Sequence, residues 1–106
     1  MLLAAGCGEE PSLPSDLSGS LAALADSAAQ EVEAGRPCSA LDDAAELHDR
    51  AIVAINDGRV PGELQEELLG GANALLDSIS CTPPRIDPAA ADEARDLAEW
   101  LRERSG

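Results

Sequence analysis

The chain has 106 residues, which is enough for one domain with a small hydrophobic core. Its 21 acidic residues against 7 basic ones give a formal net charge of −14, which disfavours binding to nucleic-acid backbones and to anionic lipid headgroups. The chain contains one Trp and neither Phe nor Tyr, so its apolar residues are mainly Ala and Leu. Because both residues favour helices, the composition predicts an all-α domain.

Residues 1–7 end in a cysteine that follows small apolar residues. Leu2-Leu3-Ala4-Ala5-Gly6-Cys7 resembles the end of a bacterial lipoprotein signal, the lipobox, whose cysteine is acylated and becomes the new amino terminus. Lipoboxes usually have Leu three places before the cysteine, where this chain has Ala4. The resemblance implies that Cys7 is a lipidation site and that residues 1–7 are the remnant of a longer signal. The alternative is a frayed terminus containing an unrelated cysteine.

Residues 8–14 are polar and contain two prolines, so we expect a flexible acidic tether between the anchor and the domain. A helix is predicted over residues 15–34, where apolar side chains recur at helical spacing. Gly35-Arg36-Pro37 should end it. The apolar positions of this helix are Leu17, Leu21, Leu24, Ala28 and Val32.

Two further helices, over residues 39–57 and 61–80, should form an antiparallel hairpin because the segment between them is short. Ser39 is the expected N-cap of the first, and Asn56-Asp57-Gly58 its end. Pro61 should occupy the first position of the second helix. The predicted inner faces are Leu41, Ala44, Ala45, His48, Ala51, Ile52 and Ile55 on the first helix, and Leu64, Leu68, Ala72, Leu75 and Ile79 on the second.

The hairpin brings two of the three cysteines together. Cys38 stands at the start of its first helix and Cys81 at the end of its second, and helices of similar length in an antiparallel pair place these positions at the same end. We therefore predict a disulfide between Cys38 and Cys81, which leaves Cys7 for acylation. Two unrelated buried thiols are the alternative.

Residues 82–106 should form an extended Pro-rich exit followed by a helix over about 88–104. Its apolar face comprises Ala90, Ala94, Leu97, Ala98 and Leu101. Trp100 lies off that face, where it either covers the edge of the core or anchors a partner. We expect residues 15–81 to be the core, with the last helix packed on it or loosely attached. The fold class is thus all-α, a small antiparallel three- to four-helix bundle with a disulfide-stapled central hairpin.

No pattern in the sequence predicts catalysis, a cofactor or a metal site. His48 has no nucleophile or carboxylate held near it by sequence spacing, which favours a partly buried or rim histidine over a base or ligand. The acidic residues Asp42, Asp43, Glu46 and Asp49 form a solvated face or, alternatively, attract divalent cations. Gly70-Gly71 interrupts a helix of strong formers, through either close packing or a bend.

Taken together, the lipobox-like start, the tether, the helix ending in GRPC and the hairpin closed by a cysteine resemble small secreted lipoproteins of high-GC actinobacteria over residues 1–81. The resemblance implies an extracytoplasmic domain anchored to the cell membrane through Cys7. We predict a non-catalytic interaction or cell-envelope module that binds a protein partner rather than nucleic acid or a small-molecule substrate. The alternatives are a soluble redox-responsive protein that uses Cys38 and Cys81, and an acidic binder of divalent cations.

Overall fold

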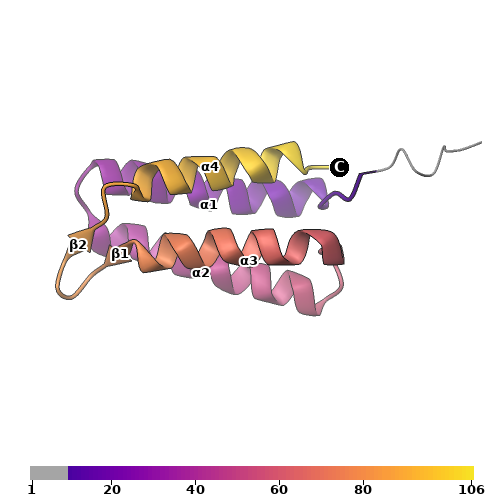
Figure 1. The fold of residues 1–106 in the computed structure, drawn as a ribbon, viewed down its shortest axis with the longest axis horizontal. Helices are drawn as coiled ribbons and strands as arrows, with labels where there is room; N and C mark the ends of the chain where they lie inside the picture. The colour runs from indigo at the N-terminus through magenta and orange to yellow at the C-terminus, as the bar shows by residue number, and fades with distance from the viewer. Residues whose placement is uncertain (1–9) are drawn as a thin grey trace, which may run out of the picture.

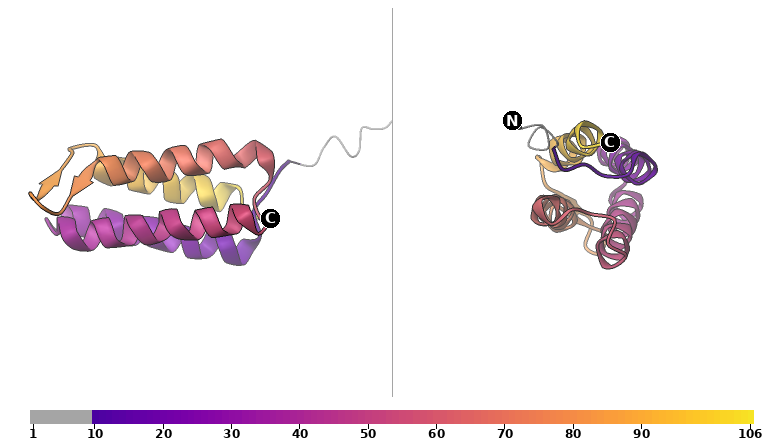
Figure 2. Two further views of the ribbon diagram at one scale, coloured as in Figure 1. Left: turned by 90° about the horizontal axis from the view of Figure 1, so that it is seen from below. Right: turned by 90° about the vertical axis from the view of Figure 1, so that its right-hand side faces the viewer.

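The computed structural model describes residues 10–106, which are mostly helical, as the composition predicts. The helices are α1 (Ser15–Glu33), α2 (Pro37–Asn56), α3 (Gly62–Asp77) and α4 (Ala90–Glu103), and a short hairpin of β1 (Ile79–Ser80) and β2 (Arg85–Ile86) separates α3 from α4. Consecutive helices run in opposite directions along one long axis (Figure 1). Seen end-on they stand at four corners, with α1 beside both α2 and α4 (Figure 2).

The turns between helices lie where the sequence predicts them. Gly35 after α1 and Gly58 after α2 have positive φ angles of 73° and 78°, which suit glycine because it lacks a Cβ. The predicted N-cap of α2 was wrong: the helix begins at Pro37, two residues before Ser39, because proline fits a first helical position that needs no N–H partner. Pro61 in turn precedes α3 rather than opening it.

The core is thin and aliphatic. On α2 the buried face is Ala40, Ala44, Leu47, Ala51 and Ala54, so the stripe is rotated from the one that the sequence predicted. His48 and Ile52 are half-buried at its edge, and Leu47 takes the central position. The small alanines on α1 and α4 allow these two helices to pack closely along their length.

The last helix is part of the bundle. Its predicted apolar face is buried, and two ion pairs connect α4 to α1 beside it: Arg95 with Glu33, and Arg102 with Asp26. The core therefore comprises all four helices, which decides between the packed and the loosely attached arrangement.

The prediction of an extended Pro-rich segment after α3 was wrong. Residues 82–84 lie in a turn rather than an extended segment, because Ile79 pairs with Ile86 and Ser80 with Arg85 in an antiparallel ladder. This ladder also ends α3 at Asp77, before the predicted residue 80. The N–H of Asp87 donates to the Ser78 carbonyl at 2.8 Å and extends the pairing by one bond.

The segment before α1 packs against the helical bundle at Leu13. Leu13 is 1% exposed, its N–H donates to the Arg104 carbonyl at 2.7 Å, and its carbonyl accepts from the Gly106 N–H at 2.9 Å. A free tether through residue 14 is therefore contradicted at Leu13, because this apolar side chain is buried in the core. Residues 1–9 lie outside the described part of the chain.

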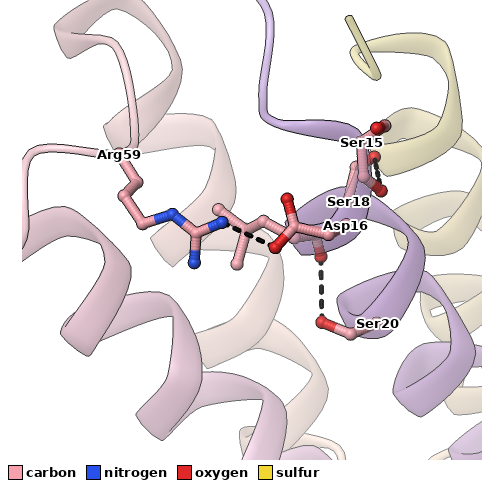
Figure 3. A network of polar contacts seen from close by, with 6 residues as sticks. Ser15, Asp16, Ser18, Ser20 and Arg59 are labelled. Carbon is pink, nitrogen blue, oxygen red and sulfur yellow. Dashed lines mark hydrogen bonds and ion pairs between the residues drawn. The ribbon is translucent and has the colours of Figure 1, made fainter.

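The beginning of α1 is also tied to the turn between α2 and α3. The Arg59 Nη2 donates to Asp16 Oδ2 at 2.8 Å, and this contact is drawn as a dashed line in Figure 3. This hydrogen bond to Arg59 lowers the pKa of Asp16. The hydroxyls of Ser18 and Ser20 donate to carbonyls three residues earlier in the same helix, which satisfies them without a partner outside it.

Candidate functional site

The predicted disulfide is confirmed. Cys38, the second residue of α2, is bonded to Cys81, which directly follows β1, with Cα atoms 4.6 Å apart. The Cys38 side of the bond is exposed and Cys81 is half-buried. The bond closes the end of the bundle at which the β-hairpin lies (Figure 1). The third cysteine, the predicted lipidation site Cys7, lies outside the described residues.

Trp100 bridges the core and the surface. It is half-buried against the core, and its indole Nε1 donates to Glu67 Oε2 on α3 at 3.2 Å. The guanidinium of Arg104 lies 5.3 Å from the ring centroid, at the distance of a cation–π contact. Trp100 therefore covers the edge of the core, and part of its surface is left for an adjoining groove.

This groove, which we call the α3–α4 groove, is an open depression of about 410 Å³ between the two helices. Figure 2 shows in the end-on view that α3 and α4 stand at neighbouring corners of the bundle. The residues that line the groove are Glu67, Gly70, Gly71, Ala74, Glu93, Asp96, Leu97 and Trp100. Its floor is thus apolar and shallow, with carboxylates around it.

The two glycines of α3 have different surroundings. A Cβ on Gly71 would lie 2.8 Å from Leu97 Cδ1, so this glycine lets α3 and α4 approach one another. A Cβ on Gly70 would have no neighbour within 4 Å. Close packing, one of the two sequence-based explanations, therefore accounts for Gly71 and leaves Gly70 without an internal reason.

The groove carries negative charge. Glu67, Glu93 and Asp96 contribute carboxylates, and no basic side chain is among its lining residues within the described part of the chain. Two of these carboxylates accept hydrogen bonds from neutral donors: Glu67 from Trp100, and Glu93 from the hydroxyl of the buried Ser78. The opposite side of α4 differs, because arginines there pair with acids of α1.

A pair of acids, of which sequence reasoning singled out Asp43 but missed Glu31, lies between α1 and α2. Glu31 shares a hydrogen bond with Asp43, which together with burial and the nearby Asp43 charge raises the pKa of Glu31 to about 7, against an opposing effect of Arg36. Its Oε1 is buried without a hydrogen-bond partner among residues 10–106. The signal was available, since Glu31 follows the buried Ala28 by three residues, the spacing of an inward helix face.

The other residues that the sequence singled out lie at the surface or at the rim of the core. His48 is 27% exposed, and its Nδ1 lies 3.6 Å from the exposed carboxylate of Asp49, consistent with a histidine at the rim of the core. Glu46, of the predicted acidic face, pairs with Arg50 one turn later. In the part of the chain that the structure describes, no group of three or more His, Cys, Asp or Glu side chains is arranged to hold a metal ion.

None of the helices in residues 10–106 combines the length and apolar character that crossing a bilayer requires. Comparisons of the chain with models of protein families, with curated proteins and with solved structures found no match. The features that bear on function are the disulfide, the α3–α4 groove and the sequence around Cys7.

Proposed function

We propose that this chain is an extracytoplasmic interaction module, anchored to the cell membrane through a lipid on Cys7 and stabilised by its disulfide. The anchored domain presents a surface for a partner rather than a catalytic centre. The observation that carries the proposal is the bond between Cys38 and Cys81.

The chemistry of this bond supports an extracytoplasmic location. Structural disulfides persist in oxidising compartments and are reduced in most cytosols. Cys38 lies at the surface, where cytosolic reductants would reach the bond. The core also benefits from a covalent link, because alanines form much of it and bury little apolar area each.

The sequence around Cys7 supports the proposed anchor. Small apolar residues precede this cysteine and a polar stretch follows it, as in lipidated proteins that must clear the membrane surface. With Cys38 and Cys81 bonded, acylation would also remove the remaining free thiol. The high net negative charge disfavours direct contact with anionic lipids, which is compatible with attachment by a lipid chain.

The experiment compares the wild type with Cys7→Ser, each expressed from the native gene with its upstream region. We expect the wild type in the membrane fraction, with an intact mass that includes acyl chains on Cys7. The variant should lose those chains and leave the membrane fraction. Cys7→Ser in the membrane fraction at wild-type level, or an unmodified Cys7 in the wild type, would contradict the anchor.

A redox-responsive protein is the second candidate, favoured by the exposure of Cys38. In that case the disulfide would open and close in the cell rather than persist. Trapping of free thiols before and after an oxidative challenge separates the two candidates. Conversion of Cys38 and Cys81 from thiols to a disulfide during the challenge would favour the second one, and a bond present throughout favours the module.

A further inference from the structure

We propose that the α3–α4 groove is the docking site of this module, and that its occupant is a basic amphipathic helix of a protein partner. The helix would place aliphatic side chains on the floor formed by Gly70, Ala74 and Leu97, with Arg or Lys side chains beside the surrounding carboxylates. This inference rests on the proposed function, because it names the surface and the partner chemistry of the same module.

The shape of the groove suits a helix. Gly70 and Ala74 are exposed and one turn apart on α3, so the backbone is accessible where a larger side chain would block it. Glycine within a helix costs about 1 kcal/mol relative to alanine, and no atom of residues 10–106 lies close enough to an added Cβ to require Gly70. An occupant that approaches the backbone of α3 would provide a reason for this residue.

The charge determines the class of partner. Glu67, Glu93 and Asp96 line an apolar floor without a basic residue among the described lining residues, whereas acids on the α1 side of α4 are neutralised by Arg95 and Arg102. The basic side chains of a partner would pair with the groove carboxylates, as the arginines of α4 pair with acids on the opposite side of this helix. An acidic or neutral helix would leave these carboxylates unpaired.

Trp100 provides both an anchor and a signal. Its ring lines the groove, its indole N–H is held by Glu67, and the Arg104 guanidinium lies 5.3 Å from its centroid, so the ring is preorganised for an incoming side chain. Because the chain contains no other Trp and neither Phe nor Tyr, its intrinsic fluorescence comes from a residue that lines the groove.

The experiment titrates the oxidised full chain with three synthetic helical peptides of about 18 residues. The peptides share the same Leu positions and differ in having Arg and Lys, Gln, or Glu on the flanks. We expect the basic peptide to change the Trp100 emission and to bind at least about tenfold more tightly than the neutral one at low salt. Its affinity should fall as salt increases, since the carboxylates are exposed to screening.

Two leucine substitutions provide matched variants. Gly70→Leu should abolish binding by filling the groove, while Gly19→Leu, at another exposed helical glycine with no atom within 4 Å of an added Cβ, should leave it unchanged. Asp96→Asn should weaken binding of the basic peptide and leave the neutral peptide unaffected. Circular dichroism establishes that each variant remains folded.

Several results would overturn the docking site. These are no binding of the basic peptide, equal binding of the acidic one, or equal affinity for wild type and Gly70→Leu. Binding of spermine with the same affinity as the peptide would show charge attraction without helix docking. A membrane-anchored, disulfide-bonded protein without peptide binding would reject only this inference, whereas peptide binding by a chain found soluble and reduced in cells would reject only the proposed function.

Discussion

Cys38 in the first turn of α2 is covalently bonded to Cys81 after β1, although 43 positions separate them in the sequence. Between them lie both helices of the α2–α3 hairpin, so the bond encloses that whole hairpin. The other end of the hairpin is held by the Arg59–Asp16 contact to α1. The two ends thus differ in strength, because one is held by a covalent bond and the other by a solvent-exposed ion pair.

Removal of the disulfide should destabilise the domain by about 2–4 kcal/mol, because the loop it closes would regain conformational entropy in the unfolded chain. Cys38→Ser combined with Cys81→Ser tests this by urea denaturation, followed by circular dichroism. Reduction of the wild type should produce a similar loss. A double variant as stable as the oxidised wild type would show that the bond contributes nothing to the fold.

The adjacent glycines of α3 should respond in opposite ways to alanine. Gly70→Ala should raise the free energy of unfolding by about 0.5–1 kcal/mol, since the methyl group meets no atom within 4 Å and glycine disfavours helix. Gly71→Ala should give no gain or a loss, because its methyl group would press on the buried Leu97. Thermal melts of both variants provide the comparison, and equal stabilisation by both would refute the close contact of α3 and α4.

Leu13 should contribute as much to the stability of the fold as a buried leucine within a helix, although it lies before α1. Leu13→Ala should cost about 2–4 kcal/mol, because the side chain is almost fully buried. Ser12→Ala, at the exposed neighbouring position, is the control and should change stability by less than about 0.5 kcal/mol. A Leu13 variant with wild-type stability would restore the free tether through residue 14.

Glu31 should make stability depend on pH in the neutral range. Its pKa rises from 4.5 to about 7 on folding, so between these values the folded state binds more protons than the unfolded state. The stability contribution is therefore fully present below about pH 4.5 and is lost as pH rises through about 7. Asp16 and Glu33, whose pKa values are lowered by hydrogen bonds from Arg59 and Arg95, act in the opposite direction in more acidic solution.

Denaturation at pH 5 and pH 8 tests this assignment. Glu31→Gln should match the wild type at pH 5 and exceed it at pH 8 by roughly 1 kcal/mol, after allowance for partial solvent exposure. Glu66→Gln, at an exposed position of α3, is the control for removing one charge. If Glu31→Gln and Glu66→Gln shift the pH dependence equally, overall charge and not the contact with Asp43 is responsible.

Much of the fold was predictable because local rules and the hydrophobic pattern agree. Gly35 and Gly58 end α1 and α2 as glycines with positive φ commonly do, and the short connections force neighbouring helices to be antiparallel. The position of the disulfide follows from these features. The residue at the centre of the buried face of α2 was less predictable, because helical spacing alone allows either His48 or Leu47 to lie near the core.

Features that depend on contacts between distant segments could not be predicted in this way. Leu13 stands among prolines and polar residues, and its burial depends on backbone pairing with Arg104 and Gly106 and on packing in the core of the bundle. The strand pairing of Ile79 with Ile86 likewise involves two residues per strand, too few for an alternating pattern. Prediction of the groove would have required knowing which faces of α3 and α4 meet. The spacing of apolar residues in the sequence does not specify this.

The most direct test of the account is the state of Cys38 and Cys81 in the cell. Free thiols are blocked in intact cells, the protein is purified without reductant, and trypsin digestion is followed by mass spectrometry. We predict that the peptide ending at Arg50, which contains Cys7 and Cys38, is linked through Cys38 to the Cys81 peptide ending at Arg85 in nearly all molecules, with the linked cysteine located by fragmentation. Alkylated Cys38 and Cys81 in unlinked peptides would contradict a stable disulfide and, with it, the proposed extracytoplasmic module.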